Sequence, residues 1–144
     1  SSIAIEAMSA SDGKNRNLLF MQEDFVKYDF NLLNSIDVFY SRFTIHAINK
    51  HDEGILLPKI YNSLNIEGLF CVEVRTTRDS LYGVGSPCGD NTFLTDHRRR
   101  FIDAQVFLQQ VLALGFKLLF FIEEDNLSVY QGDNPTLMRV VLKK

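Results

Sequence analysis

Short apolar runs that alternate with stretches of helical spacing are the feature that most constrains this fold. The apolar runs, each bounded by polar residues, are residues 17–22, 35–40, 69–74, 116–122 and 137–142. Helical spacing occupies residues 3–10, 52–64 and 103–114. Apolar runs of this length are typical of buried strands, and strands separated by helices predict an α/β fold with a mostly parallel sheet. The last two runs have no helical spacing between them, so we expect them to pair antiparallel.

The helix predicted for residues 52–64 contains a proline. Leu56, Ile60 and Leu64 fall on one face, as in an amphipathic helix. Pro58 removes a backbone donor, which a helix tolerates best in its first turn. The pattern leaves open whether the regular helix starts near Pro58 or contains it.

The second helix has clear signals at both ends. Asp103 is predicted as its N-cap because a carboxylate there can accept from the first free backbone N–H groups. Phe107, Val111 and Leu114 repeat at helical spacing, and Gly115 is predicted to end the helix.

The composition is that of an ordinary globular domain. The 144 residues are 46% apolar, include 12 Phe and 5 Tyr, and carry a net charge of −3. This apolar content suffices for a core and excludes disorder of the whole chain. The slight negative charge favours neither nucleic acid nor an anionic membrane as a partner, and no apolar run is long enough to span a bilayer. Cys71 and Cys88 lie in no metal-binding or disulfide pattern, so we expect reduced thiols, no metal site and a cytoplasmic location.

Ligands of such sheets bind beyond the carboxyl ends of the strands, where four polar stretches follow predicted strands. These stretches are residues 22–25, 40–46, 73–85 and 97–101. In the first, Asp24 and Phe25 could bind an adenine, but a turn acid that caps the next segment is the interpretation favoured by spacing alone.

The other stretches bring together cations and histidines. Arg42 and His46 are four residues apart and would share a face of a helical turn, where arginine could hold a carboxylate. A surface cation and a histidine with its hydrogen bonds satisfied are the interpretation favoured by spacing alone. Glu73 and Arg75 end a buried strand, and the His97–Arg100 run precedes the capped helix. We expect all of these residues to form one cluster at the same edge of the sheet.

No stretch of the sequence carries a P-loop, a metal-ligand cluster or a nucleophile beside a base. Gly83 and Gly85 are not followed by the third glycine of a dinucleotide-binding loop. From the residues alone, the chain is an α/β protein with an anion-binding edge.

Taken in order, several stretches resemble the carboxyl-terminal two-thirds of a class I S-adenosylmethionine-dependent methyltransferase. They are Asp24-Phe25, residues 35–48, residues 64–75, the run 97–101 and Gly115-Phe116. The resemblance implies a Rossmann-like, mostly parallel sheet with an antiparallel carboxyl-terminal strand pair.

The same resemblance implies roles for particular residues. Asp24 would accept from the adenine amino group of S-adenosylmethionine, and Phe25 would lie near the adenine ring. Ser41 and Arg42 follow the strand that lines the methionine end of this cofactor. The residues implied to face the acceptor substrate are His46, Tyr82, His97 and Arg100. His46 or His97 could remove a proton if the acceptor needs it.

Methyltransferases of this class begin with a strand, a Gly-rich loop and a second strand that ends in an acid. The 144 residues contain none of these, so we expect residues 1–144 to form a single partial methyltransferase domain, truncated at its amino end. The two absent strands are central in the usual sheet, and their loss would deprive residues 17–22 of neighbours. Unpaired strand edges recruit partners, so we expect a homodimer.

The function implied by the resemblance is methyl transfer to an unidentified small or medium-sized acceptor by the intact domain. We expect the chain alone to bind S-adenosylmethionine weakly or not at all, and to be inactive. The alternative is a non-catalytic binding or dimerisation module. An oxidoreductase on a similar sheet is disfavoured because its dinucleotide would need the same Gly-rich loop.

Overall fold

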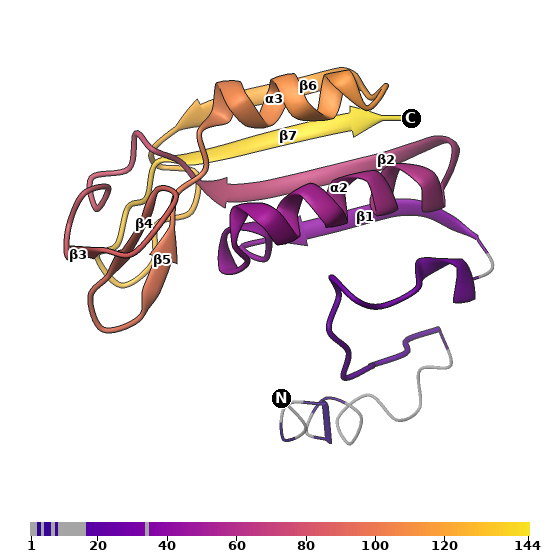
Figure 1. Ribbon diagram of the computed structural model, residues 1–144, viewed down its shortest axis with the longest axis horizontal. Coiled ribbons are helices and arrows are strands. Elements are labelled where there is room, and N and C mark those ends of the chain that lie inside the picture. The colour runs from indigo at the N-terminus through magenta and orange to yellow at the C-terminus, as the bar shows by residue number, and fades with distance from the viewer. Residues whose placement is uncertain (1–2, 4, 7, 9–16, 34) are drawn as a thin grey trace.

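A mixed four-stranded sheet forms the centre of the molecule. The computed structural model describes residues 3, 5, 6, 8, 17–33 and 35–144. The strands lie in the order β1 (Ile36–Arg42), β2 (Leu64–Arg75), β7 (Leu137–Lys143) and β6 (Lys117–Glu124). β1 and β2 are parallel, and β7 is antiparallel to both β2 and β6. β1, β2 and β6 therefore run in one direction and β7 in the other (Figure 1), which confirms the α/β fold and the antiparallel carboxyl-terminal pair.

Two helices cover the same face of this sheet (Figure 1). α2 (Lys50–Ser63) starts at Asn49, whose side chain accepts from the backbone N–H of Asp52 at 2.8 Å. α3 (Ala104–Ala113) confirms the predicted cap, because Asp103 Oδ1 accepts from Val106 N at 3.0 Å. Pro58 lies inside α2 rather than at its start.

The core lies between these helices and the sheet. Alternate residues of the two central strands point toward the helices, so Phe70, Val72 and Val74 of β2 are buried. Leu56 and Ile60 of α2 pack in the same cluster, as the helical spacing predicted. Among the residues that the structure describes, no helix is long and apolar enough to cross a membrane.

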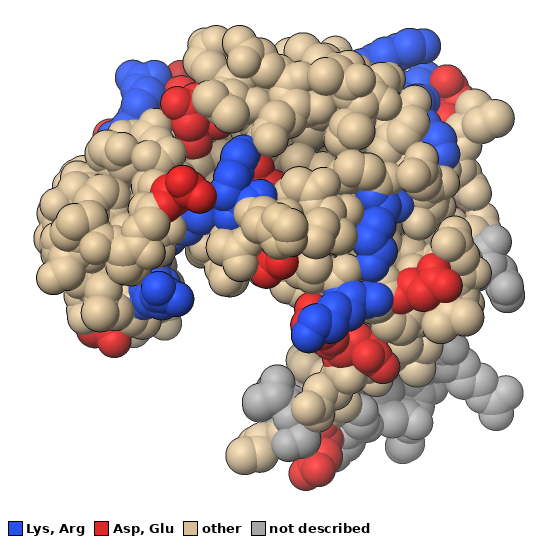
Figure 2. Space-filling model, viewed as in Figure 1, with Lys and Arg blue, Asp and Glu red and all other residues tan. Residues whose placement is uncertain are grey.

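A second, small sheet occupies the polar connection between β2 and α3. It consists of β3 (Ser86–Pro87), β4 (Thr92–Leu94) and β5 (Arg98–Arg100), joined antiparallel in that order. The sequence predicts neither a strand nor a helix in this connection. Figure 2 shows this sheet as a lobe set apart from the helical layer, with basic side chains in the notch between them.

The predicted strand at residues 17–22 is wrong. These residues form no strand in the structure, and Leu18 and Leu19 are exposed. A strand needs a neighbour to receive its backbone hydrogen bonds, and this segment does not pair with β1, although β1 lies at the edge of the sheet with one side free. Of the helix predicted for residues 3–10, Ile3, Ile5, Glu6 and Met8 are helical, and the rest of that stretch lies outside the described residues.

The sheet face opposite α2 and α3 carries exposed apolar side chains. We call it the open face and define it by Val38, Tyr40, Cys71, Phe120 and Val141. In β1, β2 and β7 these residues alternate with residues that pack in the core, whereas the neighbours of Phe120 in β6 are exposed as well. Val38 is 54% exposed and Tyr40 69%. Four of these residues, all but Val38, line a hollow of about 370 Å³.

Candidate functional site

The largest hollow near the predicted cluster lies at the carboxyl ends of β1 and β2. It has a volume of about 600 Å³, within the range of small-molecule sites. We call it the strand-end pocket; its lining residues are Arg42, Phe43, His46, Arg75, His97, Arg99, Ser128, Val129, Tyr130, Asp133 and Pro135. The structure therefore brings Arg42, Arg75, Arg99 and both candidate histidines together, which confirms the predicted cluster in part. Arg98 and Arg100, which were expected in the same cluster, do not line this pocket.

A row of ion pairs crosses the sheet beside this pocket, and of its three residues only Arg42 lines the pocket. Arg42, Glu73 and Arg139 occupy facing positions on β1, β2 and β7. Arg42 Nε donates to Glu73 Oε1 at 2.7 Å, and Arg139 Nε donates to Oε2 at 2.5 Å. Burial of Glu73 favours its neutral form, but these hydrogen bonds outweigh burial and lower the pKa of its carboxyl. Arg42 is thereby engaged by Glu73, and its other end donates to Ser128 Oγ at 3.0 Å.

The turn after β1 has unusual backbone geometry. Phe43 has a φ of +55°, in the left-handed region that is rare for a bulky residue. Its N–H donates to the carbonyl oxygen of Glu73 at 2.8 Å, and the Arg42 guanidinium lies 4.9 Å from the centre of its ring. This turn holds the Phe43 ring in the wall of the strand-end pocket.

His46 lies in the short helix η2 (Ile45–Ala47) directly after that turn. Burial, and then the charges of Arg75, Arg100, Arg99 and His97, lower the pKa of His46 to about 4. Its buried Nδ1 has no hydrogen-bond partner among the residues that the structure describes. At neutral pH the ring is therefore uncharged and has an unused polar atom.

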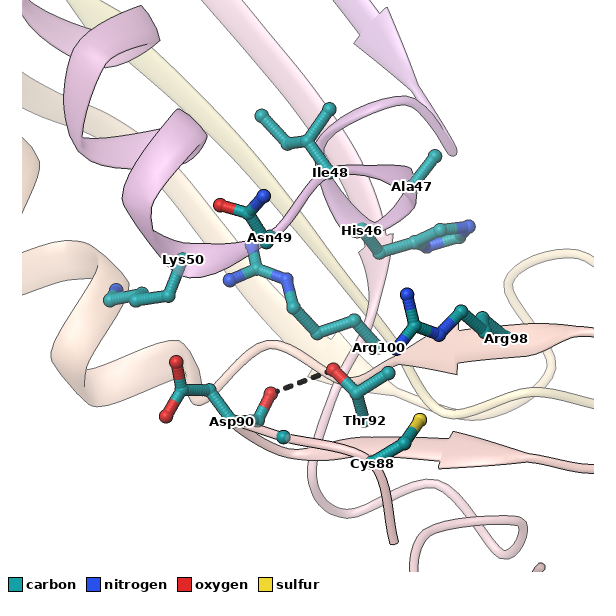
Figure 3. A pocket seen from close by; sticks show the side chains of 11 residues that line it. His46, Ala47, Ile48, Asn49, Lys50, Cys88, Asp90, Thr92, Arg98 and Arg100 are labelled. Carbon is teal, nitrogen blue, oxygen red and sulfur yellow. Dashed lines mark hydrogen bonds between the residues drawn. The ribbon is translucent and has the colours of Figure 1, made fainter. Parts of the chain in front are cut away.

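Strand alternation divides the arginine run of β5 between two pockets. Arg99 lines the strand-end pocket, whereas Arg98 and Arg100 line a neighbouring hollow of about 180 Å³, which shares His46 with that pocket. Figure 3 shows both of these guanidinium groups extending into that hollow, with Arg100 reaching toward Asn49 and Lys50 at the start of α2.

Arg100 has a structural partner. It is 5% exposed and forms an ion pair with Glu53, a fully buried carboxylate of α2 that also accepts from Lys50 Nζ at 2.6 Å. A terminal nitrogen of Arg100 donates to the carbonyl oxygen of Ile45 at 3.3 Å. These contacts attach the small sheet to the start of α2, and Arg100 does not line the strand-end pocket.

His97 orients Arg99. Its Nδ1 lies 2.9 Å from Asp96 Oδ2, and its Nε2 lies 3.1 Å from a terminal nitrogen of Arg99. A guanidinium only donates, so Nε2 accepts and Nδ1 carries the hydrogen toward Asp96. Hydrogen bonds from Thr95 and His97 hold the pKa of the Asp96 carboxyl well below its usual range. In this arrangement the Nε2 lone pair of His97 is already used.

Only two of the four residues implied for the cofactor lie in the same hollow. Phe25 and Ser41 line one hollow of about 150 Å³, which also contains the rings of Phe30 and Phe39. The Ser41 hydroxyl is buried without a partner among the described residues. Asp24 does not line this hollow: its carboxylate accepts from Val26 N at 3.1 Å and pairs with Lys27, as a turn acid does. Arg42 is engaged by Glu73.

Tyr82 does not line the strand-end pocket. Its hydroxyl donates to Asn91 Oδ1 at 3.0 Å, and its ring contacts Phe93 and Phe101 edge to face. The ring thus packs within the small sheet, and the structure does not bring it to the histidines.

The sequence analysis missed the part of the pocket that comes from the β6–β7 loop. Ser128, Val129, Tyr130 and Asp133 belong to this loop, which follows the carboxyl end of β6 and so meets the ends of β1 and β2. The direction of β6 is the signal that could have located these residues, because loops that follow parallel strands lie at the same edge of the sheet.

The small sheet also had a sequence signal. Gly89, Asp90 and Asn91 separate two short segments, and such a turn is typical of a hairpin. Gly89 and Asn91 both have positive φ values in the structure.

The comparisons with known proteins identify the fold. No protein-family model and no curated protein matches the chain. Among solved structures, it is similar to a Listeria monocytogenes protein described as an S-adenosylmethionine-dependent methyltransferase, with 14% identity and a TM-score of 0.74 over 96% of this chain and 75% of the other. A methyltransferase from Methanosarcina mazei gives 14% identity and a TM-score of 0.72 over 100% of this chain and 78% of the other.

A third similar structure contains a bound ligand. The glycopeptide N-methyltransferase MtfA, complexed with S-adenosyl-L-homocysteine, is 11% identical with a TM-score of 0.67 over 99% of this chain and 70% of the other. These likenesses show that the chain has a class I methyltransferase-like fold.

Proposed function

We propose that this protein takes part in S-adenosylmethionine-dependent methyl transfer to a small or medium-sized acceptor bound in the strand-end pocket. The observation that carries the proposal is the position of this pocket, at the carboxyl ends of parallel strands in a methyltransferase-like fold. The 600 Å³ volume suits an acceptor of that size.

Phe25 and Ser41 are the residues that would hold part of the cofactor. Their hollow offers an aromatic surface for a planar ring and a hydroxyl without a partner, which suits a nucleoside. Its 150 Å³ is too small for the entire cofactor, and the sequence has no Gly-rich loop to hold the remainder, so we expect binding weaker than about 100 µM. When bound, S-adenosylmethionine supplies a methyl group on a positively charged sulfur.

The chain contributes by positioning the acceptor, because neither histidine is arranged to remove a proton from it. His46 is uncharged at neutral pH, and its pKa of about 4 makes proton removal by it inefficient. His97 already accepts from Arg99. The site therefore suits an acceptor whose attacking atom has a free lone pair, held in line by the pocket walls.

The proposed cofactor contact can be tested with S-adenosylhomocysteine as the probe. Saturation-transfer NMR on the full chain should show contact with its adenine protons. Ser41→Ala should weaken binding about fivefold through loss of one hydrogen bond, whereas Ser80→Ala, at an exposed serine, should not change it. No saturation transfer, or equal affinity in all three proteins, would refute the proposal.

A second candidate is a dimerisation module, and the open face is the observation that favours it. Adjacent to that face, the edge strand β6 exposes Leu118, Leu119, Phe120 and Phe121 in sequence. Lys117 begins this strand and Glu124 ends it. A second copy that paired with β6 antiparallel would place each lysine near the other copy's glutamate and cover the apolar residues between.

A further inference from the structure

The charges that line the strand-end pocket are not all balanced. Arg42 is paired with Glu73, and Arg75 is paired with Asp79 and Asp133. Arg99 is different: within the part of the chain that the structure describes, no carboxylate lies within ion-pair distance of it, and its contact is His97 Nε2. Arg99 is half-buried, so the pocket contains a guanidinium whose charge no described carboxylate balances.

The guanidinium of Arg99 is held in place before any ligand arrives. β5 pairs Arg99 with Phe93 of β4, which fixes the backbone. The Asp96–His97 pair then holds one terminal nitrogen, as described above. A pre-oriented guanidinium with free N–H groups is suited to bidentate binding of a carboxylate.

The wall next to this cation is apolar. Phe43, Val129, Tyr130 and Pro135 all line the pocket, and Val129 and Tyr130 are 60% and 71% exposed. These side chains have apolar surface that a ligand could cover. The pocket thus combines one unpaired cation with a hydrophobic surface.

We propose that the strand-end pocket binds a small carboxylic acid with an apolar body, whose carboxylate pairs with Arg99 and whose body lies against Phe43, Val129 and Tyr130. The assignment of this acid as the methyl acceptor rests on the proposed function; its binding does not. His97 acts here as a positioning residue for Arg99.

Phenylacetate and its neutral amide, phenylacetamide, are suitable probes for the full chain. Amide NMR titration should show phenylacetate binding at least tenfold more tightly than phenylacetamide, with shifts at Arg99 and Phe43. Because this comparison uses the unmodified protein, it needs no variant that might lose its fold. Equal affinity for acid and amide would overturn the proposal.

The neighbouring arginine provides a matched control. Arg99→Gln should weaken phenylacetate binding about tenfold, whereas Arg98→Gln removes the same charge from the other side of β5 and should change it less than twofold. Equal losses in both variants would mean that net charge alone attracts the acid, and would also overturn the proposal.

Titration with S-adenosylhomocysteine separates this proposal from the proposed function. If the acid binds at Arg99 and S-adenosylhomocysteine does not bind at all, the result supports the carboxylate site and refutes its role in methyl transfer. If S-adenosylhomocysteine binds and the pocket does not distinguish acid from amide, the result refutes the carboxylate site and supports the proposed function.

Discussion

His46 is a buried histidine surrounded by positive charge, and this makes the stability of the protein depend on pH. Its pKa is lowered to about 4 in the folded state, against 6.5 in an unfolded chain. Between these values the unfolded state binds the proton more readily, so stability is complete above pH 6.5 and falls as the pH drops toward 4. The shift corresponds to about 3 kcal/mol in total, of which about 2 kcal/mol is lost between pH 7 and pH 5.

Urea unfolding of the parent and of His46→Asn at pH 7 and pH 5 measures this contribution. We expect the parent to lose about 2 kcal/mol more than the variant over that interval. The comparison cancels the carboxylates, which titrate in both proteins. Identical losses in the two proteins would show that His46 titrates normally.

The sequence predicted which stretches carry the cations of the site, but it could not predict which face of a strand each cationic side chain occupies. The residues of the 97–100 run were expected in one cluster, and strand alternation sends Arg99 into the strand-end pocket while Arg98 and Arg100 face elsewhere. Side-chain direction depends on secondary structure, and this stretch was predicted as a loop. Asp24 illustrates the opposite case, because the turn-acid interpretation favoured by spacing matches its contacts.

Among the helices and strands, α3 was predicted from local sequence signals. Its N-cap can be tested by substitution. Asp103 Oδ1 accepts from Val106 N at 3.0 Å, so Asp103→Ala leaves that donor without its partner. We expect a loss of about 1 kcal/mol in the free energy of unfolding, measured by urea denaturation. Asp103→Asn, which keeps an accepting oxygen, should lose much less. A loss near zero for Asp103→Ala with α3 intact would contradict the capping role.

The elements that the sequence failed to predict depend on distant partners. Residues 17–22 are apolar enough for a strand, but strand formation also needs a neighbouring backbone, and this segment does not pair with the free side of β1. The two-residue strand β3 is too short to produce an apolar pattern, and it exists because β4 pairs with it. Helix α2 was predicted from its apolar face, which is a local signal; its Asn49 cap was not predicted, and the helix contains Pro58 in its interior.

At the scale of the whole molecule, the open face and the β6 edge predict self-association. Size-exclusion chromatography with light scattering should give a mass near twice the 16.5 kDa of one chain at high micromolar concentration. Phe120→Lys should shift the protein to the monomer by placing a charge on the apolar surface. Leu32→Lys, at an exposed leucine in η1 (Phe30–Leu32), is the control and should remain associated. A parent protein that stays monomeric would contradict this prediction.

The proposed function requires that a nucleotide cofactor binds, with incomplete anchoring, at the carboxyl edge of the sheet. Residue-resolved amide NMR during titration with S-adenosylhomocysteine tests it most directly. We predict shifts at Phe25 and residues 39–43 that saturate only above about 100 µM, with no change at the opposite end of the sheet, around Gly68 and Lys143. Shifts confined to that opposite end, no shifts at about 5 mM ligand, or micromolar binding by a monomer would contradict the account.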